Sequence, residues 1–213
     1  MVKTSNFDNN FRDWVASACE QWKYPSPPDS WYAKTYSRLP DGLRKIIGDG
    51  ISEGCIIPSG YQFTLTGIKE GKGPYAWLSR SSSNKPDPNW EYFVQAAEYC
   101  RLRSIAVEKR LRVTFEDGLM DIAVYADNDL LICCEVKEKA SALKKLVTGI
   151  KRYQGGVDLS GPDRGNDPLR KAKYLVSYRP KYFSAVAIGM RLEFSVTYQG
   201  KDQFELHEDV IPL

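Results

Sequence analysis

The sequence of 213 residues has little of what several common chemistries require. It contains one histidine, His207, which excludes any mechanism that needs two imidazole groups. The cysteines are an odd number and lack the Cys-x-x-Cys spacing of zinc sites, which predicts reduced, buried thiols. They are Cys19, Cys55, Cys100, Cys133 and Cys134. The last two are adjacent, so their side chains would point to opposite faces of a strand.

Other motifs are missing as well. The sequence has no Gly-x-Ser-x-Gly elbow for serine catalysis, and its glycine-rich segments 48–54 and 67–74 do not match a dinucleotide-binding or Walker A loop. No charged-then-apolar leader opens the chain, and its longest apolar runs are far too short to cross a bilayer. We therefore expect a cytoplasmic protein without a membrane partner.

The formal net charge is only +3, but it is distributed unevenly. Residues 101–181 contain 17 Lys and Arg against 11 Asp and Glu, so the positive excess lies in this part of the chain. Such an excess is typical of a surface that binds a polyanion, and it is equally typical of a solvated face.

The first part of the chain predicts helices and a hairpin. Apolar residues at helical spacing predict an amphipathic helix over 9–22, and shorter helices are expected over 31–38 and 41–47. The segments 61–68 and 74–80 predict a hairpin around the glycine-rich segment 69–73. The aromatic side chains here could stack on bases, but core packing is the favoured interpretation; they are Trp31, Tyr32, Tyr36, Tyr61, Tyr75 and Trp77.

The polar segment 81–89, SSSNKPDPN, reads as a linker. It places a boundary near residue 85, between an N-terminal region (1–85) that would select the substrate and a core (86–213). In the core, Asp87 and Pro88 predict a helix start. The elements expected next are a strand over 105–115, a turn at 116–118, a hairpin over 119–137, a helix over 139–154 that ends at Gly155-Gly156, a strand over 173–179, and two or three strands up to Glu208.

This order of elements predicts an α/β fold with a mixed sheet flanked by helices. Three strands form a meander, and the last of them, the helix and the strand that follows should form a right-handed parallel crossover unit.

The hairpin carries an unusual feature, because it places acids in two nearly continuous apolar runs. If the hairpin is centred on Asn128, facing residue numbers add up to 256, and Asp121 then lies opposite Glu135 with Lys137 on the same face. Two acids and an ammonium at a strand end are typical of a divalent-metal site that acts on a phosphodiester.

These residues resemble the PD-(D/E)XK nuclease superfamily, which includes many restriction endonucleases and Holliday junction resolvases. The resemblance covers roughly residues 88–179: an acidic helix, a strand, GLMDIAV with Asp121, CCEVK with Glu135 and Lys137, and a further helix. It implies a restriction endonuclease-like αβββαβ core. Met120 stands where the family's first motif has proline.

The resemblance also implies roles for individual residues. Asp121, Glu135 and the backbone carbonyl of Val136 would ligate the metal, and Lys137 would face the phosphate or orient a water. A helical glutamate would join them, either Glu91, which we favour, or Glu98. On the helix after the hairpin some members carry Gln-x-x-x-Tyr; here Gly149 stands in place of that glutamine, and Tyr153 is followed by Gln154.

The sequence therefore predicts a nuclease that depends on Mg²⁺ or Mn²⁺ and hydrolyses DNA, most simply as an endonuclease, with RNA and a homodimer left open. Nucleic acid would contact the helix after the hairpin, through Lys144, Lys145, Lys151, Arg152, Tyr153 and Gln154. Two alternatives remain: a catalytically silent nucleic-acid-binding module with the same fold, and an interaction protein in which the apolar hairpin is only core.

Overall fold

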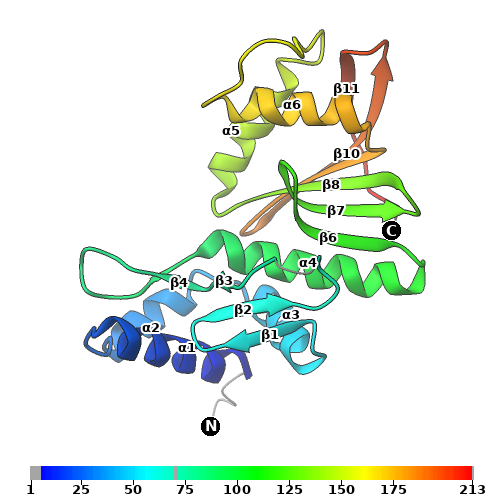
Figure 1. Ribbon diagram of the computed structural model, residues 1–213. Coiled ribbons are helices and arrows are strands. Elements are labelled where there is room, and N and C mark those ends of the chain that lie inside the picture. Colours follow the sequence, from blue (N-terminus) through cyan, green and yellow to red (C-terminus); the bar gives the residue numbers. More distant parts are fainter. Residues whose placement is uncertain (1–5, 70–71, 213) are drawn as a thin grey trace. The chain divides into compact units, whose positions relative to one another are not determined.

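The computed structural model describes residues 6–69 and 72–212 (Figure 1). The chain divides into two compact units, Met1–Arg101 and Leu102–Leu213. The division falls within helix α4 (Trp90–Glu108), whereas the linker-like composition placed a boundary near residue 85. Among the described residues, no helix combines the length and the apolar character that a membrane crossing requires.

The first unit contains the three predicted helices and two small sheets. The predicted hairpin is present as a pair of antiparallel strands, although residues 70–71 of its loop lie outside the described residues. An additional strand, β1, precedes it and was not predicted. The elements are α1 (Asn6–Trp22), α2 (Asp29–Tyr36), α3 (Asp41–Ser52), β1 (Ile56–Ser59), β2 (Gln62–Leu65), β3 (Tyr75–Ala76), β4 (Leu78–Ser79) and β5 (Asp87–Pro88).

Closely packed aromatic rings lie in the core of this unit. The Trp77 ring lies 3.8 Å from that of Phe63, 4.7 Å from that of Phe93 and 4.8 Å from that of Trp14, measured between centroids. All four side chains are buried. Of the aromatic residues considered for base stacking, Tyr32, Tyr75 and Trp77 are buried, which confirms core packing for these three.

The five cysteines are free and buried, as predicted. Cys55 and Cys100 meet inside the first unit with their Sγ atoms 2.9 Å apart. The adjacent pair Cys133 and Cys134 lies on strand β8 (Asp129–Lys137), where neighbouring side chains point to opposite faces, as expected.

Two predictions about α4 are wrong. Asp87 and Pro88 do not begin the helix, because they pair with Leu78 and Ser79 as strand β5. The helix starts at Trp90, after Asn89, whose side-chain amide donates to the carbonyl of Ala76. Its C-terminal end also lies later than expected, since residues 105–108 are helical and not part of a strand. Arg110, with φ of 56°, separates this helix from the strand that follows.

The second unit is built on a six-stranded mixed sheet with the order β11-β10-β9-β8-β7-β6. Strands β8 and β9 are parallel and the other neighbours are antiparallel, which confirms the predicted α/β class with a mixed sheet. The strands are β6 (Arg112–Asp117), β7 (Met120–Ala126), β8 (Asp129–Lys137), β9 (Tyr182–Ala187), β10 (Met190–Gln199) and β11 (Gln203–Glu208).

Two helices connect β8 to β9 and pack on one face of the sheet (Figure 1). Helix α5 (Ala140–Lys151) was predicted, with a later end. Helix α6 (Asp167–Tyr178) corrects the predicted strand over 173–179. The side chain of Asn166 accepts a hydrogen bond from the backbone of Leu169 and caps this helix, and Pro168 lies in its first turn, where it costs no hydrogen bond.

The hairpin of β7 and β8 has the predicted register in the part next to Asp121 and Glu135. Ile122 faces Cys134 and Ala123 faces Cys133, so these residue numbers add up to 256 as expected. Near the turn the register differs by one residue, because Ala126 faces Asp129 across a two-residue turn. A β-bulge next to Val124 absorbs the difference.

Candidate functional site

The predicted acid pair, Asp121 and Glu135, lies near the ends of β7 and β8. Ile122 pairs with Cys134, and continuing the same register by one residue sets Asp121 opposite Glu135. Its Oδ2 accepts a hydrogen bond of 2.6 Å from the backbone N–H of Val136. Both side chains share the sheet face of Ala123 and Cys133, which is the face that α5 and α6 cover.

Glu135 is almost completely buried, with 1% of its side chain exposed, and each of its oxygens meets an ammonium group. Lys137 Nζ lies 2.8 Å from Oε1 and is 23% exposed. Lys171 Nζ lies 2.6 Å from Oε2 and is 9% exposed. The contact with Lys137 is the ion pair that strand alternation favours, because the two residues are two positions apart on one face.

Lys171 is the member of the cluster that the sequence did not reveal. It belongs to α6, in the stretch before the segment interpreted as a strand, and its ammonium also donates to the carbonyl of Leu119. The sequence did hold a signal for this helix: Asn166 followed by Asp167 and Pro168 is a helix start of the same kind that we expected at Asp87. Recognising it would have placed Lys171 on a helix, though not against Glu135.

Glu135 is buried and Asp121 is half-buried, and this loss of solvent makes both acids poor anions. It raises the pKa of Asp121 to about 8, with a further contribution from the charge of Glu135, against the Val136 N–H and the two lysines. Burial also raises the pKa of Glu135, while Lys171 and Lys137 act in the opposite direction. The pair therefore holds negative charge at a high free-energy cost, which any additional cation would reduce.

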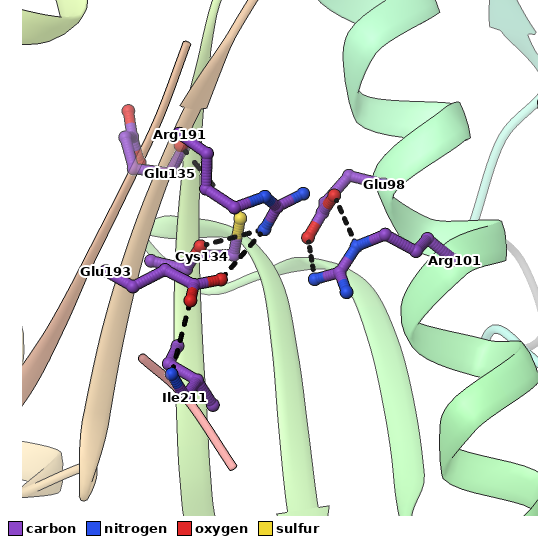
Figure 2. Close-up of polar contacts among 8 residues, drawn as sticks. Glu98, Arg101, Cys134, Glu135, Arg191, Glu193 and Ile211 are labelled. Atoms are coloured by element: carbon purple, nitrogen blue, oxygen red, sulfur yellow. Dashed lines mark hydrogen bonds and ion pairs between the residues drawn. The ribbon is translucent and has the colours of Figure 1, made fainter. Parts of the chain in front are cut away.

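The reverse face of the same strands carries a separate polar group (Figure 2). Cys134 aligns with Ser184, and Ser184 with Glu193, so these three point away from the acid pair. Arg191 donates to the hydroxyl of Ser184 over 3.4 Å and to Glu193 over 3.3 Å. Glu193 also accepts the backbone N–H of Ile211, 3.2 Å away, which fastens the C-terminal segment to β10.

The two helical glutamates belong to the first unit. Glu98 is buried and forms a two-pronged ion pair with Arg101, with distances of 2.8 and 3.1 Å (Figure 2). Glu91 is partly exposed in the first turn of α4. The buried carboxylate of Glu98 is thus already paired with a guanidinium.

The predicted nucleic-acid residues of α5 and the turn after it have different environments. Lys144, Lys145 and Arg152 are exposed. Lys151 is only partly exposed, since its ammonium lies 3.7 Å from Glu208 and over the ring of Phe194. Tyr153 and Gln154 are half-buried. The Tyr153 hydroxyl accepts a hydrogen bond from Asn166, and Gln154 Oε1 is buried with no hydrogen bond to any residue that the structure describes.

Gly149 stands where the resembled family has glutamine, and the structure gives a reason for it. A Cβ atom at this position would lie 2.7 Å from Cγ of Pro168. The close approach of α5 to the start of α6 thus excludes a side chain here. The helix that supplies Lys171 occupies the space of that glutamine.

The acid pair fits a hard divalent cation in its donor chemistry. It offers carboxylate oxygens from two neighbouring strands, and Glu135 Oε2 is buried without a well-directed hydrogen bond, although Lys171 lies close to it. Within residues 6–69 and 72–212, no group of three or more His, Cys, Asp or Glu side chains is arranged to hold a metal. A bound ion would therefore have two acidic ligands and would need a backbone carbonyl, such as that of Val136, and water.

Comparisons of the chain with protein-family models, with curated proteins and with solved structures found no match.

Proposed function

We propose that the chain is a divalent-metal-dependent nuclease that hydrolyses DNA, most simply as an endonuclease with a restriction endonuclease-like core. The observation that carries the proposal is the acid pair with Lys137 at the ends of β7 and β8. An apolar sheet interior gains nothing from two carboxylates on one face, because they repel and are costly to bury. A cluster that is expensive for the fold is typical of a site kept for chemistry.

In this proposal Asp121, Glu135 and the Val136 carbonyl hold Mg²⁺ or Mn²⁺. The bound ion supplies a water of lowered pKa and neutralises charge on the phosphate. Lys137 is the more exposed of the two lysines, so its ammonium can reach a phosphate oxygen or orient the attacking water. Phosphates of the DNA backbone other than the one that is cleaved would be bound by Lys144, Lys145 and Arg152.

One observation favours a second candidate function. Each oxygen of Glu135 already has an ammonium partner, so the cluster is neutralised without any metal. A nucleic-acid-binding module that has the fold but does not cleave would look the same. The two candidates differ in whether a divalent ion binds at the acid pair.

The test combines cleavage with metal binding. Supercoiled plasmid is incubated with the protein and Mg²⁺ or Mn²⁺, and a single-stranded RNA serves as a second substrate. We expect nicking of the plasmid by wild type and none by Asp121→Asn, whose amide keeps an acceptor for the Val136 N–H and removes the charge. Lys137→Ala should also lose cleavage but bind DNA within a few fold of wild type, because one lysine adds little to the summed phosphate attraction.

Asp129→Asn is the matched control, since Asp129 is exposed on the same hairpin. It should cleave like wild type. Calorimetric titration of Mn²⁺ should show binding to wild type that is absent in Asp121→Asn. Equal cleavage by wild type and Asp121→Asn would refute the nuclease assignment, and DNA binding without Mn²⁺ binding would support the silent module.

A further inference from the structure

Lys171 is the more deeply buried of the two ammonium groups at the acid pair, and the proposed chemistry does not use it. Its side chain is 9% exposed, and it reaches the cluster from α6, across from the strands that carry the acids. It lies 2.6 Å from Glu135 Oε2 and donates to the Leu119 carbonyl in the turn before β7. A buried ammonium needs such partners, since an unpaired one is costly.

The ammonium of Lys171 lies 2.6 Å from Glu135 Oε2, and the register of β7 and β8 sets Asp121 opposite Glu135. Lys171 therefore has the electrostatic role that a shared cation would have at this pair. Lys137 differs, because it contacts Oε1 from the neighbouring position on β8 and is more exposed.

We infer that Lys171 is the internal counter-ion of the acid pair and that a divalent cation must displace its ammonium from Glu135, so that Lys171 sets the affinity of the site for metal. This inference rests on the proposed metal site and adds to it a residue that the motif does not contain. Lys171 acts through Glu135 and is a positioning residue.

The local structure allows the exchange without moving the fold. Helix α6 is fixed by its cap at Asn166 and by Ala172 and Leu175, both fully buried in the core. The side chain of Lys171 is flexible. When the Glu135 carboxylate binds a metal ion instead, the ammonium of Lys171 keeps the Leu119 carbonyl as a hydrogen-bond acceptor. Displacement leaves the helix in place and costs the ion pair between Lys171 and Glu135, and this cost is what lowers the affinity of the site for metal.

Titration of Mn²⁺ into the whole chain tests the inference. Lys171→Met keeps most of the stem and removes the charge, and it should bind Mn²⁺ roughly 10- to 100-fold more tightly than wild type, the range that neighbours of metal ligands span. Lys171→Arg keeps the charge and should bind as wild type does. Lys173→Met is the matched control on α6. Lys173 donates to the Gly161 carbonyl and lies 3.8 Å from Asp163, and both of these partners lie outside the acid pair, so Mn²⁺ affinity should not change.

Unchanged or weaker Mn²⁺ binding by Lys171→Met, with binding by wild type intact, overturns the inference and leaves the proposed function standing. No binding by wild type or by Lys171→Met refutes the proposed metal site as well. Binding by Lys171→Met alone supports the inference that the lysine opposes the metal, and it refutes the metal-dependent nuclease assignment for wild type in favour of the silent module.

If removal of the Lys171 charge unfolds the protein in EDTA, circular dichroism of Lys171→Met with and without Mn²⁺ still tests the inference. A Lys171→Met protein that is unfolded in EDTA and regains the wild-type spectrum with Mn²⁺ supports the inference, because the ion then replaces the lysine. A protein that stays unfolded in Mn²⁺ overturns it.

Discussion

Asp121 carries its charge where burial and the Glu135 carboxylate both oppose it, and this gives stability a defined pH dependence. Its pKa is raised to about 8 in the folded protein, against 3.8 for an ordinary aspartate. Between these values the folded state binds more protons than the unfolded state, so stability in EDTA falls as pH rises from 4 to 8. The contribution is fully present below pH 4 and is lost above pH 8.

We expect urea midpoints in EDTA to fall between pH 5 and pH 8.5 for wild type and much less for Asp121→Asn. The loss from this residue over this pH range is at most about 4 kcal/mol, since stability falls by roughly 1.4 kcal/mol for each pH unit between pH 5 and the folded-state pKa of about 8. The exposed control Asp129→Asn should follow wild type. Parallel curves for wild type and Asp121→Asn would mean that Asp121 titrates as in water.

Glu135 differs from Asp121, because two ammonium groups depend on it. Glu135→Gln leaves Lys137 and Lys171 facing an uncharged amide, and Lys171 is too buried to reach water. We expect a loss of roughly 3–5 kcal/mol in urea unfolding with EDTA, the range for breaking a buried ion pair. Adding Lys171→Met to Glu135→Gln should recover part of that loss, because the stranded charge is then removed.

Glu193→Gln is the comparison on the reverse face of the sheet. Its partner Arg191 is half-exposed, so the loss should stay below about 1 kcal/mol. Equal stability of Glu135→Gln and wild type would show that both lysines find other partners.

At the level of elements, the sequence predicted what depends on local pattern. The hairpin of β7 and β8 follows from alternation and a short polar turn, and its register near the acids is correct even though a bulge was not foreseen. Helix α6 was mistaken for a strand because 173–179 is rich in aromatic and apolar residues, and tertiary packing against α5 overrides that local preference. Lys171 was missed for the same reason: its contact with Glu135 joins elements that no sequence spacing relates.

The contact of α5 with α6 gives a prediction at this scale. Alanine is a better helix former than glycine by about 1 kcal/mol, yet Gly149→Ala should destabilise the protein, because its Cβ would lie 2.7 Å from a rigid proline ring. We expect a net loss of about 1–3 kcal/mol in urea unfolding. Pro168→Ala in the same chain should relieve most of it, and Thr148→Ala, on the exposed face of α5, is the control. A Gly149→Ala protein more stable than wild type would show that the two helices can separate at no cost.

At the scale of the whole molecule, the sequence predicted a mixed α/β sheet and an uneven charge distribution. It did not predict which basic residues are free to bind, because that depends on tertiary partners. Lys151 illustrates this, since α5 brings it beside Glu208 of β11 and over Phe194 of β10, both far along the chain. Lys144, Lys145 and Arg152 belong to the same basic segment and remain exposed.

The salt dependence of DNA binding can separate these two groups of residues. Each lysine or arginine that neutralises a phosphate contributes roughly one unit to the slope of log affinity against log salt. We therefore expect Lys144→Gln, Lys145→Gln and Arg152→Gln each to flatten the slope by about one unit, measured by fluorescence anisotropy with a duplex in EDTA so that no cleavage occurs. Lys151→Gln should change the slope less, because its ammonium already has a carboxylate and an aromatic ring as partners. An unchanged slope in all four variants would assign this face of α5 to solvent, and the polyanion would then have to bind elsewhere on the positive segment 101–181.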